Sequence, residues 1–136
     1  MAARHHLILH FDGGSRGNPG PGYGSYVLMA DGREQRRRRL DFGPHRTNNE
    51  AEYEALLAGL QDTLAWLAEQ RADPAQASLE VRGDSQLVIR QLQGAWRCRE
   101  PRMAVLCSRA QALLQRFGRR TLRLVPREKT MEVLGH

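Results

Sequence analysis

Three acidic side chains lie in short polar or glycine-rich stretches that are far apart along the chain. Asp12 opens a glycine-rich run, Glu52 ends a polar run that begins at Thr47, and Asp84 stands between a glycine and a serine. Mg²⁺ prefers hard carboxylate oxygens and takes its remaining ligands from water and substrate phosphate. Two such ions, about 3.5–4 Å apart, can activate a water and stabilise a leaving oxygen. These acids therefore predict a metal site that faces a polyanion.

The charge balance favours a phosphate-bearing partner. The 136 residues include 21 Lys+Arg against 15 Asp+Glu, which gives a net charge of +6 and a pI near 10.3. Lys129 is the single lysine. Two explanations of the arginine excess stay open: a GC-rich genome, or guanidinium groups that bind phosphate in a bidentate manner.

Metal chemistry based on histidine or cysteine finds little support. His6 and His10 form a weak pair on one predicted strand, and the other histidines show no ligand spacing. Cys98 and Cys107 lack the spacing of a metal site and are too few for a disulfide framework, so we expect reduced thiols.

The elements that must position the three acids follow from the apolar pattern. Strands are predicted over 7–11, 23–30, 33–42, 79–82 and 121–125, the second and third joined by a hairpin turn at Asp31-Gly32. Helices are predicted over 48–70, 101–117 and the segment from Asp84, as N-cap, to about Gly94. Thr47 or Asn48 would cap the first helix, and the tail after Pro126 has room for one helical turn.

This order predicts an α/β fold of three layers, with a five-stranded mixed sheet and helices on both faces. If strands 7–11 and 79–82 are parallel neighbours, Asp12 and Asp84 lie at their carboxyl ends, where open sheets bind ligands. The helix after Asn48 would add Glu52. We expect a single domain over 1–136. No apolar run reaches the roughly 20 residues of a membrane span, and the N-terminus lacks a signal-peptide core, so we expect a soluble, cytoplasmic protein.

Three runs of residues, in their order along the chain, carry a specific family resemblance. They are Phe11-Asp12-Gly13-Gly14-Ser15-Arg16-Gly17-Asn18-Pro19-Gly20-Pro21-Gly22, Thr47-Asn48-Asn49-Glu50-Ala51-Glu52-Tyr53 and Gly83-Asp84-Ser85-Gln86-Leu87-Val88. They resemble the signature motifs of type 1 ribonuclease H, in its compact archaeal and bacterial form. The resemblance covers essentially the whole chain. It implies hydrolysis of the RNA strand of RNA/DNA hybrids with Mg²⁺, or Mn²⁺ as a substitute, and leaves double-stranded RNA open as a second substrate.

The same resemblance implies roles for individual residues. Asp12, Glu52 and Asp84 match the metal-binding carboxylates, with Asp12 bridging two ions. Four amides match positions near the minor groove of the hybrid, where hydroxyls and base edges offer donors and acceptors: Asn18, Asn48, Asn49 and Gln86. The alternative for the asparagines is turn formation and capping, and Asn48 could do both. We also expect Ser15 and Arg16 to line the first loop, where backbone N–H groups could meet phosphate.

The chain departs from the family at its fourth carboxylate. Aligned from Arg127, Thr130 replaces an asparagine and Leu134 replaces the aspartate of the last helix. Either Glu128 or Glu132 substitutes, or the chain is natively short or truncated, or the tail, about 127–136, is atypical. We favour a solvated tail for both glutamates. The gap puts rate and metal preference in question more than hybrid binding.

Two rival functions remain. A degenerate domain would bind hybrid or duplex RNA without cutting it, as Leu134 allows. Alternatively, Asp12-Gly13-Gly14-Ser15 is the phosphate loop of a sugar kinase or actin-like ATPase, but those proteins need two such domains and 136 residues supply one. We expect a monomer.

Residues outside the three runs are less informative. The run from Arg36 to Arg39 lies on the third predicted strand, where a solvated edge that deters aggregation is favoured over phosphate contact. Trp66 is expected in the core. Trp96 either packs a loop or stacks near the DNA strand.

Overall fold

The computed structural model of the chain describes residues 4–135. Its elements are, in order, β1 (His6–Ser15), β2 (Gly20–Ala30), β3 (Arg33–Arg46), α1 (Asn48–Glu69), the 3₁₀ turn η1 (Pro74–Gln76), β4 (Ser78–Gly83), α2 (Gln86–Leu92), α3 (Pro101–Leu114), β5 (Arg119–Leu124) and α4 (Arg127–Leu134).

The five strands form one mixed sheet in the order β3-β2-β1-β4-β5. β1, β2 and β3 are an antiparallel meander, whereas β4 runs parallel to β1 and β5 runs parallel to β4. The predicted five-stranded mixed sheet is confirmed, and the structure shows that the first and fourth strands are parallel neighbours, which was the condition for bringing the acids together. This pairing brings the carboxyl end of β4 beside the second half of β1.

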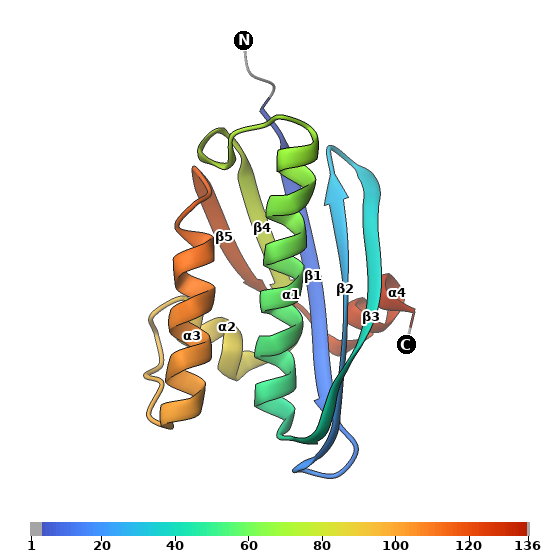
Figure 1. Cartoon of the computed structure of the whole chain (residues 1–136), viewed down its shortest axis with the longest axis vertical. Helices are drawn as coiled ribbons and strands as arrows, with labels where there is room; N and C mark the ends of the chain where they lie inside the picture. Colours follow the sequence, from blue (N-terminus) through green and yellow to red (C-terminus); the bar gives the residue numbers. More distant parts are fainter. Residues whose placement is uncertain (1–3, 136) are drawn as a thin grey trace.

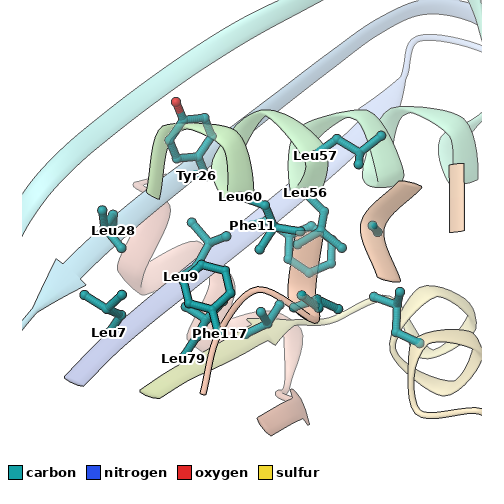
Figure 2. Close-up of a cluster of buried hydrophobic side chains, with 14 of the residues drawn as sticks. Leu7, Leu9, Phe11, Tyr26, Leu28, Leu56, Leu57, Leu60, Leu79 and Phe117 are labelled. Atoms are coloured by element: carbon teal, nitrogen blue, oxygen red, sulfur yellow. The ribbon is translucent and has the colours of Figure 1, made fainter. Parts of the chain in front are cut away.

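Helices cover both faces of the sheet, as predicted. In Figure 1, α1 crosses the front of the sheet with α3 to its left, and α4 lies behind β2 and β3. Leucine and aromatic side chains fill the space between the sheet and α1 (Figure 2). Leu9 and Phe11 of β1 are buried there with Leu56 and Leu60 of α1. Trp66 is also buried, as expected.

Helix α1 begins with a capping box, which fixes the position of its first turn. The Thr47 hydroxyl accepts from the Glu50 N–H at 3.1 Å, and the Glu50 carboxylate accepts from the Thr47 N–H at the same distance. Of the two predicted caps, the structure therefore selects Thr47. Glu52 follows in the next half turn, at a defined height above the sheet.

Several boundaries differ from the prediction. β1 continues through Asp12 to Ser15, because Gly13 and Gly14 still pair with β2. β2 and β3 are longer for the same reason, since their pairing extends toward Gly20 and Arg46. Helix α3 ends three residues early, where the chain turns to let the Gly118 N–H donate to two carbonyls before β5.

The tail forms an eight-residue helix rather than a single turn. This helix packs on β1 and β2. Within residues 4–135, no helix is long and apolar enough to cross a membrane.

Candidate metal centre

The three predicted acids meet at one point of the structure. Asp12 lies on β1, Glu52 in α1 and Asp84 directly after β4, and one carboxylate oxygen of each lies within 4.8 Å of the others. Asp12 is buried, whereas the other two are partly exposed. The parallel β1–β4 pair supplies two of the acids and α1 supplies the third, as the predicted topology required.

A glycine beside Asp12 allows α1 to approach the sheet. A Cβ at Gly13 would lie 2.6 Å from the Glu52 backbone nitrogen and would also strike the Ala51 carbonyl. Any side chain here would push the first turns of α1 away from β1. Gly13 therefore sets the distance between Asp12 and Glu52.

Glu52 is the most perturbed acid of the cluster. Burial raises the pKa of its carboxyl to about 7; a hydrogen bond with Ser85 opposes this shift, and the charges of Asp12 and Asp84 add to it. Its Oε2 is the one buried side-chain oxygen or nitrogen within residues 4–135 that has no hydrogen-bond partner. A buried oxygen without a hydrogen-bond partner lowers the stability of the folded protein, and a cation bound at this point would provide the missing partner.

Arg127, at the start of α4, places a positive charge against the same acids. Its Nη1 donates to Asp12 Oδ2 and to Asp84 Oδ2, both at 2.9 Å. These bonds hold the pKa of the guanidinium above its usual value. Sequence reasoning used Arg127 only to align the tail and assigned it no role. The sequence feature that could have drawn attention to Arg127 is its position directly after Pro126, as the first residue of the last helix.

Asp84 does not cap α2, contrary to the prediction. The N-cap is Ser85, whose hydroxyl accepts from the Val88 N–H at 3.2 Å. The helix starts one residue later than expected, and this leaves the Asp84 carboxylate turned toward Arg127 and Asp12.

No carboxylate stands in the fourth family position. Leu134 is buried in the structure, and neither Glu128 nor Glu132, both exposed, belongs to the acidic cluster of the described residues. Glu132 instead lies 4.0 Å from Lys129. Thr130 is buried one turn after Arg127 and hydrogen-bonds to His10 of β1 at 2.9 Å, so it anchors α4 on the sheet.

The predicted substrate amides divide into two groups. Asn18 Oδ1 accepts from the Asn48 N–H at 3.0 Å, and Asn48 Oδ1 accepts from the Ser15 N–H at 2.8 Å. These bonds tie the loop after β1 to the start of α1, so Asn18 satisfies the first N–H group of the helix and the Asn48 side chain holds β1, while Thr47 remains the N-cap. Asn49 and Gln86 are exposed.

Two backbone N–H groups of the first loop have partners within the protein. The Ser15 N–H is used by Asn48, and the Arg16 N–H donates to the Pro21 carbonyl at 3.0 Å. Neither group is available for phosphate, because the loop closes on itself and on α1.

A groove of about 530 Å³ runs beside the first turn of α1. Its lining combines amides with three arginines: Asn18, Thr47, Asn49, Glu50, Leu87, Gln91, Arg97, Arg99, Glu100, Arg102 and Met103. Arg102 pairs with Glu50 at 2.8 Å. The groove thus brings Arg97 and Arg99 together with Asn18 and Asn49 of the predicted amides.

Comparison with known proteins agrees with this geometry. The family model described as "Reverse transcriptase-like" matches residues 10–133. Ribonuclease HI of Halobacterium salinarum is 41% identical over 118 residues, which cover 87% of this chain. The chain belongs to the ribonuclease HI family. A bifunctional protein of Mycobacterium tuberculosis is 39% identical over 124 residues, or 90% of this chain.

Solved structures of the ribonuclease HI family share the fold. The RNase H1 of Halobacterium salinarum superposes with a TM-score of 0.81 at 38% identity, covering 95% of this chain and 93% of that one. LC11-RNase H1, solved in complex with an RNA/DNA hybrid, gives a TM-score of 0.82 at 32% identity, covering 93% and 89%.

The matched region is only part of the curated relatives. The chain spans 32% of the mycobacterial protein and 55% of the Halobacterium ribonuclease HI.

Proposed function

We propose that this ribonuclease HI family member is an endoribonuclease that hydrolyses the RNA strand of RNA/DNA hybrids with the help of divalent metal ions. The observation that carries the proposal is the meeting of Asp12, Glu52 and Asp84 around an oxygen that lacks a partner. The hybrid bound to the similar LC11-RNase H1 supports the choice of substrate.

The acidic cluster fits Mg²⁺, with Mn²⁺ as a substitute. Asp12, Glu52 and Asp84 would supply hard oxygen ligands. Bound divalent ions activate water for attack on phosphate and stabilise the charge that develops on the leaving oxygen. The protein itself holds the carboxylates in place through β1, the capped start of α1 and the turn after β4.

The amides around the cluster would recognise the minor groove of the hybrid. Within residues 4–135, the NH₂ groups of Asn18 and Asn48 donate to no protein acceptor, since only their oxygens are used. Together with Asn49 and Gln86, they can donate to ribose hydroxyls and base edges. We also propose that the protein acts in the cytoplasm as a monomer. Double-stranded RNA stays open as a second substrate.

Cleavage of a labelled RNA/DNA hybrid tests this function. We expect cutting of the RNA strand with Mg²⁺ or Mn²⁺, none with EDTA, and a loss of at least about a hundredfold in Asp84→Asn. Glu132→Gln, which removes an exposed carboxylate outside the cluster, serves as the matched control and should retain activity. Equal rates in wild type and Asp84→Asn would refute the proposal. A labelled RNA duplex in the same assay determines the second substrate.

A second candidate is a domain that binds hybrid without efficient cleavage. The buried Leu134 in the place of an acid and the guanidinium of Arg127 between two acids favour it. Tight hybrid binding by the wild type, with no metal-dependent cutting under any of the above conditions, would select this candidate.

A further inference from the structure

A second groove, of about 400 Å³, lies on the sheet close to Asp12. It is lined by Arg16, Tyr23, Gly24, Arg39, Leu40 and Asp41. Of these residues only Arg16 lies in a family motif, and none of them belongs to the acidic cluster. Their proximity to Asp12 follows from the strand register.

Residues that pair across neighbouring strands point to the same face of a sheet. Asp12 pairs with Ser25, and Ser25 pairs with Arg39, so these three residues form one row across β1, β2 and β3. With strands about 4.8 Å apart, the Arg39 backbone lies about 10 Å from that of Asp12. The next row is Gly14, Tyr23 and Asp41.

Both rows face away from α1. A Cβ at Gly24 would lie 2.8 Å from the Ala55 side chain, which shows that Gly24 faces α1 and that its neighbours Tyr23 and Ser25 face the other side. A Cβ at Gly14 would lie 2.7 Å from the Tyr23 hydroxyl. The Tyr23 ring thus lies over Gly14, two residues along β1 from Asp12.

The groove combines an aromatic ring with uncommitted positive charge. Tyr23 is 38% exposed, although it is a large side chain beside a buried acid. Arg16 and Arg39 form no ion pair within residues 4–135. By contrast, Arg36 and Arg37 of the same run are paired, with Asp62 and Glu69 and with Glu34.

These groups match the parts of a nucleotide. Guanidinium groups bind phosphate, an aromatic face stacks on a base, and a carboxylate accepts from a ribose hydroxyl or a base amine. The negative charge of Asp41 would repel a phosphate bound alone. It suits a whole nucleotide, whose ribose hydroxyl or base amine can donate to the carboxylate. The distance of about 10 Å from Asp12 places the groove a nucleotide away from the acidic cluster.

We propose that the groove formed by Arg16, Tyr23, Arg39 and Asp41 binds a nucleotide of the RNA strand adjacent to the phosphate held at the acidic cluster. This inference rests on the proposed ribonuclease function. It assigns phosphate contact to Arg39 alone among the four consecutive arginines and leaves the other three as edge residues.

The test measures hybrid binding and cleavage by Arg39→Gln, Tyr23→Leu and Tyr23→Phe. Arg38→Gln is the matched control, since it removes the same charge from the adjacent residue on the opposite face. We expect KM and the hybrid Kd to rise about five- to tenfold in Arg39→Gln and Tyr23→Leu, with kcat changed less than about twofold. Tyr23→Phe keeps the ring and should bind like wild type.

Two further readouts separate a nucleotide contact from a fold defect. The slope of log Kd against log salt should decrease by about one in Arg39→Gln and stay unchanged in Tyr23→Leu. Thermal unfolding reports whether each variant is folded, and Arg39→Gln, an edge-strand change, keeps the test valid if Tyr23→Leu does not fold.

The two proposals fail in different ways. If wild type cleaves hybrid but Arg39→Gln and Tyr23→Leu bind like Arg38→Gln, the groove is not a nucleotide site and the ribonuclease function stands. If wild type and Asp84→Asn behave alike, the ribonuclease function itself fails.

Discussion

Arg127 determines the charge of the acidic cluster at the residue scale. Burial raises the pKa of Glu52 to about 7, so all three carboxylates are ionised only above that pH; with the guanidinium they then leave a formal charge of −2, which one divalent ion would balance. The guanidinium and a bound cation would therefore compete for the oxygens of Asp12 and Asp84. Leu134 adds no fourth charge to favour a second ion.

We expect Arg127→Gln to bind Mn²⁺ more tightly than wild type in the absence of nucleic acid, by about three- to tenfold. The reason is that the two carboxylates lose a partner with which the ion must compete. Isothermal titration calorimetry measures the affinity. Arg123→Gln, which removes an exposed arginine on β5, is the control and should leave it unchanged. An unchanged or weaker affinity in Arg127→Gln would show that the guanidinium does not compete.

Thr130 stabilises the protein through its contact with His10. Both side chains are buried, and each is the other's hydrogen-bond partner at 2.9 Å. Thr130→Val keeps the shape but leaves a buried imidazole nitrogen without a partner, so we expect a loss of about 1–3 kcal/mol in the free energy of unfolding. Urea denaturation measures this loss. Thr121→Val, at an exposed position on β5, should change stability by less than about 0.5 kcal/mol; a similarly small effect at Thr130 would contradict the prediction.

At the level of secondary-structure elements, the packing of α1 on β1 determines how close Glu52 comes to Asp12. The capping box at Thr47 starts the helix, and Gly13 allows its first turns to touch the sheet. Both features are local, but they act on the distance between two acids that are forty residues apart.

Gly13→Ala should weaken metal binding as well as stability. The added methyl group would overlap the backbone of α1, at a cost of about 1–3 kcal/mol, and would move Glu52 away from Asp12. Gly32→Ala is the control: its backbone φ of +82° makes a side chain unfavourable, but it lies in the hairpin between β2 and β3. Thermal unfolding should show both variants destabilised, whereas calorimetry should show loss of Mn²⁺ affinity in Gly13→Ala alone. Normal metal binding by Gly13→Ala would refute this account of its role.

The connection between α2 and α3 contains a cysteine whose thiol pKa is raised. Both cysteines are free, as predicted. Burial, and then a hydrogen bond with Cys107, raises the pKa of Cys98 to about 11.

We expect Cys98 to be alkylated slowly at pH 8, because only about a thousandth of it is thiolate there. The rate of reaction with iodoacetamide should rise about tenfold per pH unit and level off near pH 11. In Cys107→Ala the plateau should move to lower pH, since one cause of the shift is removed. Mass spectrometry of the alkylated peptide measures the rate, and a plateau near pH 8.5 in the wild type would contradict the prediction.

At the scale of the whole molecule, metal binding by the three acids would be coupled to folding. They repel one another only when the sheet and α1 are assembled, so a divalent ion should bind the folded state and stabilise it. We expect 10 mM Mg²⁺ to raise the Tm by about 2–5 °C relative to NaCl of the same ionic strength, assuming a Kd of about 1 mM. The shift should vanish in Asp84→Asn and persist in Glu132→Gln. Equal shifts in all three proteins would mean that Mg²⁺ acts elsewhere.

Much of the architecture could be predicted because it depends on local pattern. Alternating and helical apolar periods located all five strands and the helices α1, α2 and α3, and the Asp31-Gly32 turn indicated the hairpin between β2 and β3. Prediction was weaker at boundaries. β1 runs past Asp12 because Gly13 to Ser15 still pair with β2, and Ser85 rather than Asp84 caps α2. Such boundaries are decided by pairing and capping geometry.

Residue type and spacing were enough to predict the three acids, the first meander and the five-stranded mixed sheet, and the family resemblance added the missing fourth carboxylate at Leu134. The pairing of the first and fourth strands was a condition that the sequence left open. Only the tertiary structure decided that Arg127 donates to Asp12 and Asp84, that Glu52 keeps an unpartnered buried oxygen, and that Tyr23 and Arg39 share a sheet face with Asp12. These relations join residues far apart in the chain, and they depend on register and packing between elements, which no local pattern encodes.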